Sequence, residues 1–259
     1  MKAPLSGLRS LVEPLLGPEG WMDLALQRLE EDPLAARVLP GQRAALARAA
    51  RTAGAEMAAR ALATGRASAE ESLRDRGVTI REDGGEAASG PFVHHALYTA
   101  PPPRVTLYRR PLAVLERLLD AAALHSRLGA INVREVILAH ELCHHLVHTG
   151  GAPEAVRPRV EVLRLGPWRR RAVVRAAEEI AAAGFAAVWC DLSWPPELLD
   201  CLTLTAWRDP VALTMLDAQP SLPAARPGLR RPLSAPAQGP ALTRKDAHAD
   251  RTNGPARAV

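Results

Sequence analysis

"VILAHELCHHLVHTG", residues 136–150, places four histidines and a glutamate within nine residues, among Leu, Val and Ile. A capping pair, Asn132 with Glu135, precedes this stretch, and Gly150 supplies a stop signal. The pattern predicts one buried helix that begins at the cap and ends at this glycine. Titratable groups are costly in such a helix unless they are paired, and metal coordination would pair them.

The spacing of His140 and His144 determines what chemistry this helix could support. A helix advances about 100° and 1.5 Å per residue, so the two imidazoles lie about 40° apart around the axis and about 6 Å apart along it. Both can reach one tetrahedral zinc ion, and Glu141 lies beside them, where it can take a proton from a metal-bound water. This H-E-x-x-H arrangement predicts a Zn²⁺ site with two histidine ligands and Glu141 as general base.

The remaining histidines and the tyrosines need separate treatment. His148 continues the four-residue series, but it lies about 12 Å along the axis from His140, too far for the same ion. We expect it at the edge of the site, and the candidates for a transition-state donor are therefore His148, Tyr98 and Tyr108. Cys143 is expected to be a small buried side chain. Ordinary, partly exposed positions are expected for His94, His95 and His145.

The third metal ligand is expected in "RAAEEIAAAGFAA", residues 175–187, within a long helix predicted over residues 166–190. Glu179 has alanines at helical spacings of three, four and seven (Ala176, Ala182, Ala183 and Ala186), so its face can approach another helix closely. This favours Glu179 as the ligand. The alternatives that remain open are Glu178, which lies on a bulkier face, Asp191 and Glu154.

The chain divides into three expected regions. Residues 1–76 form an N-terminal helical region without chemical motifs, and residues 77–219 form the domain that holds the zinc site. Residues 220–259 are a Pro-, Ala- and Arg-rich basic tail that is expected to be disordered. Period-two patterns predict three strands, at 77–82, 91–98 and 104–109. Further helices are expected at 111–127, 195–206 and 209–218, with a short strand at 159–165.

Composition limits the classes of function. The net charge of +5 belongs to the tail, which has seven basic and two acidic residues. Direct nucleic-acid binding is therefore not expected. The three cysteines form no C-x-x-C pair, and neither a signal peptide nor a long apolar span is evident. These features predict a cytoplasmic protein that has no membrane partner.

"AHELCHHLVH" followed by "EEIAAAGFAA" resembles the ImmA/IrrE family of bacterial zinc metallopeptidases, over about residues 77–195. The family's second motif, E-x-x-A-N-x-F-A, is matched by Glu179, Ala182, Phe185 and Ala186. Ala183 stands where the family usually has asparagine, a departure at the second motif. The resemblance implies an α+β, predominantly helical fold, with a small three-stranded sheet packed with helices and a zincin-like active-site helix. It also implies that two histidines and one glutamate hold the zinc.

The function expected from these features is that of a zinc-dependent endopeptidase acting on a protein or peptide. Members of the ImmA/IrrE family cleave or inactivate transcriptional repressors, so a helix-turn-helix repressor is an expected substrate. The alternative is a non-catalytic, zinc-stabilised regulator that binds a repressor or another partner without cutting it. The same ligands would serve both functions, so the ligands alone do not separate them.

Overall fold

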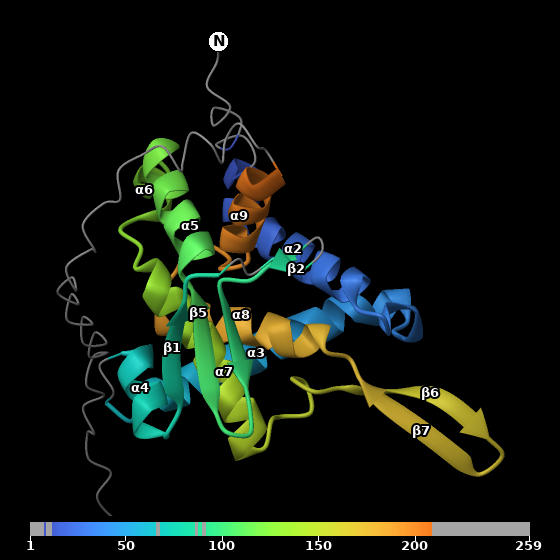
Figure 1. The fold of residues 1–259 in the computed structure, drawn as a ribbon. Helices are drawn as coiled ribbons and strands as arrows, with labels where there is room; N and C mark the ends of the chain where they lie inside the picture. Colours follow the sequence, from blue (N-terminus) through green and yellow to red (C-terminus); the bar gives the residue numbers. More distant parts are fainter. Residues whose placement is uncertain (1–7, 9–11, 66–67, 86–87, 90–91, 209–259) are drawn as a thin grey trace, which may run out of the picture. The chain divides into compact units, whose positions relative to one another are not determined.

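The computed structural model describes residues 8, 12–65, 68–85, 88–89 and 92–208, all of which belong to one compact unit, Met1–Ser221 (Figure 1). The helices, with η marking 3-10 turns, are η2 (Glu13–Leu16), α2 (Pro18–Glu31), η3 (Ala35–Arg37), α3 (Pro40–Leu62), α4 (Ala69–Asp75), α5 (Arg109–Ala121), α6 (His125–Leu128), α7 (Val133–Gly150), α8 (Ala176–Trp189) and α9 (Leu198–Arg208). The strands are β1 (Thr79–Asp83), β2 (Ala88–Ser89), β3 (Phe92–Val93), β4 (Ala96–Thr99), β5 (Arg104–Tyr108), β6 (Arg159–Leu165) and β7 (Trp168–Val173). The helix expected at 209–218 and the tail expected at 220–259 lie outside the described residues.

A three-stranded mixed sheet has the order β1-β5-β4, with β1 parallel and β4 antiparallel to the central strand β5. Val105 and Leu107 of β5 are fully buried, and β4 is left as an edge strand. The α+β fold with a small three-stranded sheet is thereby confirmed. The strand expected at 91–98 is divided, because its first part forms β3 and pairs with β2 in a separate small sheet.

Helix α7 lies behind the sheet and carries the histidines (Figure 1). Its start is fixed as the sequence predicts, because the side-chain oxygen of Asn132 accepts a hydrogen bond from the backbone N–H of Glu135 at 3.1 Å. The Glu135 carboxylate accepts bonds from the N–H of Ala69 at 2.8 Å and from the indole N–H of Trp189 at 2.7 Å. These bonds tie the first turn of α7 to α4 and α8. No described helix is long and apolar enough to span a membrane.

Helices α3 and α8 cross at two glycines. A Cβ atom added to Gly54 would lie 1.8 Å from the carbonyl oxygen of Ala181, and one added to Gly184 would lie 2.5 Å from the carbonyl oxygen of Arg51. Only glycine therefore permits this close approach. Because α2 and α3 both pack against α8, the helices before residue 77 share a core with the helix of the expected third ligand.

The long helix predicted over 166–190 is wrong in its first part. Residues 168–173 form strand β7, which pairs with β6 in an antiparallel hairpin, and α8 begins only at Ala176. Gly166 at the tip has φ +57°, a left-handed conformation that suits a two-residue hairpin turn. The N–H of Ala176 donates to the carboxylate of Asp32 at 2.9 Å. A residue distant in sequence therefore accepts one of the backbone N–H groups that have no partner within the first turn of α8.

Candidate metal centre

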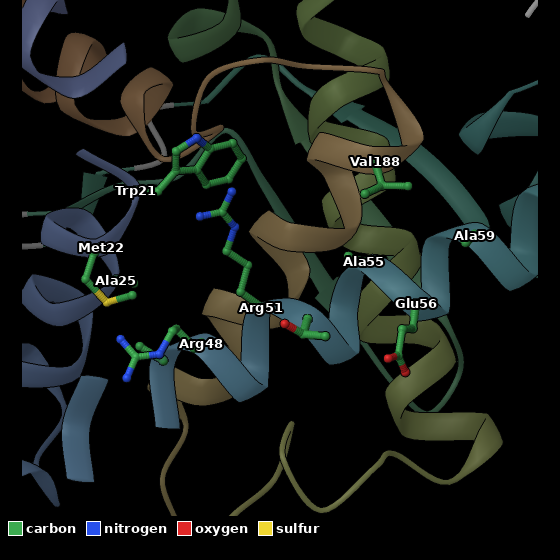
Figure 2. Close-up of a pocket in the computed structure, with 11 residues that line it drawn as sticks. Trp21, Met22, Ala25, Arg48, Arg51, Ala55, Glu56, Ala59 and Val188 are labelled. Carbon is green, nitrogen blue, oxygen red and sulfur yellow. The ribbon is translucent and has the colours of Figure 1, made fainter. Parts of the chain in front are cut away.

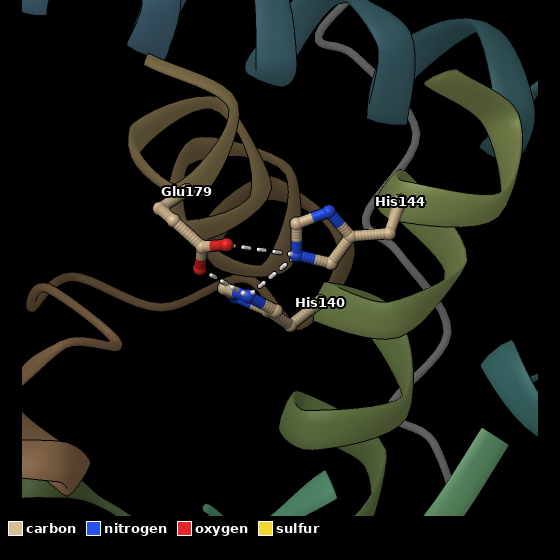
Figure 3. A group of neighbouring side chains, drawn as sticks. All are labelled: His140, His144 and Glu179. Carbon is tan, nitrogen blue, oxygen red and sulfur yellow. Dashed lines mark hydrogen bonds and ion pairs between the residues drawn. The ribbon is translucent and has the colours of Figure 1, made fainter. Parts of the chain in front are cut away.

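Helices α7 and α8 bring together the three residues expected to hold a metal (Figure 3). The Nε2 atoms of His140 and His144 are 3.2 Å apart. Oε2 of Glu179 lies 3.3 Å from Nε2 of His140, and its Oε1 lies 3.6 Å from Nε2 of His144. Their side chains are 25%, 13% and 41% exposed respectively, so the cluster is open to solvent on the side of the glutamate.

The distances within this cluster fit a single tetrahedral ion. Zinc binds histidine nitrogen and carboxylate oxygen at about 2.0–2.2 Å, so two ligand atoms at a tetrahedral angle lie about 3.3–3.6 Å apart. The 3.2 Å between the two Nε2 atoms is close to that edge length, and the two carboxylate oxygens of Glu179 lie 3.3 and 3.6 Å from one Nε2 atom each. The cluster of His140, His144 and Glu179 could therefore hold a metal ion. Asp191 and Glu154, the other positions considered for the third ligand, are exposed and are not in it.

Glu178 takes a different position from its neighbour. Its Oε1 lies 2.9 Å from Nδ1 of His144, on the opposite side of the ring from the cluster. A proton on Nδ1 makes this bond and leaves the Nε2 lone pair free for a metal, as carboxylates beside metal-binding histidines do. Glu178 also lies 3.7 Å from His148 and 3.6 Å from Arg157. It therefore orients His144 and is not itself a member of the cluster.

Charges within the site shift the pKa values of its residues. Burial alone would lower the pKa of His144, but the carboxylates of Glu179 and Glu178 outweigh it and raise that pKa to about 9. Burial alone would raise the pKa of Glu179, but the two histidines hold it well below its usual range. Carboxylates and imidazoles thus stabilise each other's charged forms here.

Glu141 is buried beside the cluster, with 6% of its surface exposed. Burial raises the pKa of its carboxyl, and His144 and His140 oppose that rise. The backbone N–H of Tyr98 lies close enough to lower this pKa as well. Because Tyr98 belongs to the edge strand β4, Glu141 lies between the metal cluster and the open edge of the sheet.

The three candidates for a transition-state donor lie at different distances from the metal cluster. The hydroxyl of Tyr98 bonds Nδ1 of His145 at 3.0 Å, and its ring packs at 5.7 Å from the ring of His148. Tyr98 and His148 thus border the site, with His148 held near Glu178. Tyr108 ends β5, and no contact between it and the cluster is found among the described residues.

Two histidines expected to be partly exposed are buried instead. His145 and His95 are each 4% exposed, whereas His94 is exposed as expected. Each buried ring has polar partners, since His145 bonds Tyr98 and His95 bonds Thr203 at 2.8 Å. Their polar partners offset the cost of burial. Cys143 is fully buried, which confirms its expected role as a small core side chain.

A group of charged residues near the cluster was not anticipated from the sequence. Arg28 of α2 donates to Asp200 of α9 at 3.1 Å, and Asp200 lies 3.3 Å from Nδ1 of His95. Burial raises the pKa of Glu197 to about 7, and its Oε2 atom is buried without a hydrogen-bond partner among the described residues. Arg28 lies close enough to Glu179 to stabilise its charge. No short-range motif indicates this group, because its members come from α2, the residue before β4, the turn before α9 and α9 itself.

A separate pocket of about 560 Å³ lies between α2, α3 and the end of α8 (Figure 2). The guanidinium of Arg51 stacks on the ring of Trp21 at 3.3 Å from its centroid, and Val188 forms part of the wall. None of the three residues of the metal cluster lines this pocket. The pocket is therefore a feature of the helical packing and not part of the metal centre.

Comparison of the chain with protein-family models, with curated proteins and with solved structures gives no match. The functional assignment therefore depends on the geometry of the metal cluster and on the residues beside it.

Proposed function

We propose that the protein is a zinc-dependent endopeptidase. The observation that carries the proposal is the cluster of possible ligand atoms of His140, His144 and Glu179, with the carboxylate of Glu141 near it. Two nitrogens and one oxygen are the donor set of many catalytic zinc sites, which keep the fourth position for water or substrate. The solvent exposure of the Glu179 side chain is consistent with an accessible fourth position.

When bound, zinc would polarise the scissile carbonyl and lower the pKa of a water molecule. In the proposed reaction, Glu141 takes the proton from the attacking water and delivers it to the leaving amine nitrogen, while the C–N bond breaks. Glu178 keeps the ring of His144 oriented through the 2.9 Å bond to Nδ1. His148, which lies near Glu178 at the border of the site, is the candidate to stabilise the developing oxyanion.

The edge strand β4 supports a peptide as the substrate class. An extended peptide can add to an open sheet edge through main-chain hydrogen bonds, which depend little on its sequence. The backbone N–H of Tyr98 lies close enough to Glu141 to influence its pKa, so this edge adjoins the proposed base. The substrate we propose, by resemblance to the ImmA/IrrE family, is a helix-turn-helix repressor encoded beside this protein.

The test compares the zinc-loaded parent with Glu141→Gln and Glu154→Gln, using a neighbouring repressor and a mixed peptide library as substrates. Glu141→Gln removes a base and no ligand, so we expect zinc content to be kept and hydrolysis to fall by at least about 10²-fold. Glu154 is exposed and outside the cluster, so its variant should behave as the parent. Zinc content and cleavage products are measured by elemental analysis and mass spectrometry.

Two results would count against the peptidase. If Glu141→Gln cleaved as fast as the parent, Glu141 would not be the base. If parent and variant both bound the repressor and neither cut it, the protein would be the non-catalytic, zinc-stabilised regulator.

A further inference from the structure

The β6–β7 hairpin has two chemically different faces. Its register pairs Leu165 with Trp168 and Leu163 with Arg170, so the three apolar side chains share one face, together with Arg170. Arg164 and Arg169 form the pair that lies between those two pairs, and their side chains point to the opposite face. That face also carries Arg171 and Arg159, with Glu161 as its acidic residue. The hairpin is therefore an amphipathic ribbon with an apolar face and a basic face.

The apolar face is open to solvent toward the tip of the ribbon. Trp168 is 80% exposed, Leu165 is 65% exposed and Leu163 is 49% exposed. At the base of the hairpin, Val160 packs against the core formed by α2, α3 and α8. The ribbon extends away from the helices in Figure 1. An exposed tryptophan and two exposed leucines on one projecting element mark an interaction surface.

The charge of the ribbon limits what can cover this surface. The hairpin holds five arginines and one acidic residue, and Glu161 already pairs with Arg164 at 2.8 Å. A second copy of the chain would bring two basic ribbons together, which repulsion opposes. A nucleic acid bound to the basic face would leave Trp168 and Leu165 in water on the other side. The occupant must therefore accept apolar side chains and carry negative charge.

We propose that the β6–β7 hairpin binds the surface of an anionic lipid bilayer. The tip pair, Leu165 and Trp168, enters the boundary between headgroups and acyl chains, a depth that tryptophan favours. Arg164 and Arg169 follow one residue, about 3.4 Å, behind the tip and reach the lipid phosphates. This inference is independent of the proposed peptidase activity, and it revises the expectation that the protein has no membrane partner.

The test measures binding of the full-length protein to vesicles, by co-sedimentation at low salt. One set of vesicles contains equal parts of phosphatidylglycerol and phosphatidylcholine, and the other contains phosphatidylcholine alone. We expect Leu165→Ser and Trp168→Ser each to weaken binding to the anionic vesicles about tenfold, because each removes an apolar group from the bilayer. Leu39→Ser is the matched control, since Leu39 is 64% exposed but lies at the start of α3.

A second pair of variants tests the charge. Arg170→Gln with Arg171→Gln should weaken binding to anionic vesicles about tenfold and leave binding to phosphatidylcholine unchanged. Arg37→Gln with Arg60→Gln removes the same charge elsewhere and should have little effect. Circular dichroism and zinc content of each variant show that it is folded.

Four outcomes would overturn the proposal. The first is that the parent does not bind anionic vesicles, and the second is that the hairpin variants bind as well as their controls. The third is binding to a DNA duplex that Arg170→Gln with Arg171→Gln weakens and Leu165→Ser does not, which would identify a nucleic acid. The fourth is a dimer that Leu165→Ser dissociates, which would identify a second copy.

Discussion

At the scale of single residues, two consecutive glutamates on one turn of α8 have different roles. Glu179 places both carboxylate oxygens toward the histidine Nε2 atoms, at 3.3 and 3.6 Å. Glu178 bonds Nδ1 of His144 from the other side of the ring. Successive residues of a helix point about 100° apart, so α8 can present one carboxylate to the cluster and one behind it. The adjacent pair thus supplies a candidate metal ligand and the carboxylate that orients His144.

Metal binding by Glu179→Ala and Glu178→Ala should separate these roles. We expect Glu179→Ala to weaken zinc binding most, because it removes one of three ligands and leaves only the two histidines. Glu178→Ala should weaken it about 10–100-fold, since the bond that orients His144 is lost. Competition with a zinc-binding dye measures both, with Glu154→Ala as an exposed control. A larger loss in Glu178→Ala than in Glu179→Ala would contradict the assignment.

Much of the candidate cluster could be predicted because its signals are local. The i and i+4 positions of His140 and His144 within one capped helix place both rings on one face. Glu179 was favoured because the alanines around it allow close approach to a second helix. The bond from Glu178 to His144 and the salt bridge from Arg28 to Asp200 were not predictable. They depend on how α2, α8 and α9 are placed, which no pattern within one segment specifies.

At the scale of elements, the hairpin shows how a helix prediction failed. Pro167 was interpreted as the first residue of a long helix, a common position for proline. Gly166 with Pro167 instead forms the two-residue connection between Leu165 and Trp168, with glycine first, as type II′ turns require. Alternation of apolar and charged residues before this Gly-Pro pair, in residues 159–165, was the available signal. Helix propensity in the alanine-rich part beyond residue 175 obscured it.

The close contact of α3 and α8 at Gly54 and Gly184 gives a prediction at the same scale. Gly54→Ala places a methyl group where the carbonyl oxygen of Ala181 lies, so α3 and α8 must separate. We expect the free energy of unfolding to fall by at least about 1–3 kcal/mol, as in overpacked cores. Gly41→Ala in the first turn of the same helix meets no atom within 4 Å and should be neutral or stabilising. Urea denaturation compares the two, and equal midpoints would show that the helices do not meet at Gly54.

At the scale of the whole molecule, a bound metal would add a further link between α7 and α8, which packing and side-chain hydrogen bonds already join. A ligand that binds only the folded state stabilises it, by about 2.7 kcal/mol at a concentration 100 times its dissociation constant. We therefore expect zinc to raise the melting temperature of the parent and a chelator to reverse the rise. Glu179→Ala should respond to neither. Magnesium, which prefers six oxygen ligands, serves as the control. Equal melting temperatures for chelated and zinc-loaded parent would contradict a metal centre between α7 and α8.

The crossing of α3 and α8 also bears on how the chain assembles as it leaves the ribosome. Gly54 belongs to a helix made early in synthesis, whereas its partner Ala181 emerges much later. Until then, the face of α3 that meets α8 lacks this partner, and the nascent chain is exposed to misassembly. Glu179 lies on the same late helix. Closing the core and completing the metal cluster therefore belong to one step of biosynthesis, and a chain stalled before α8 can do neither.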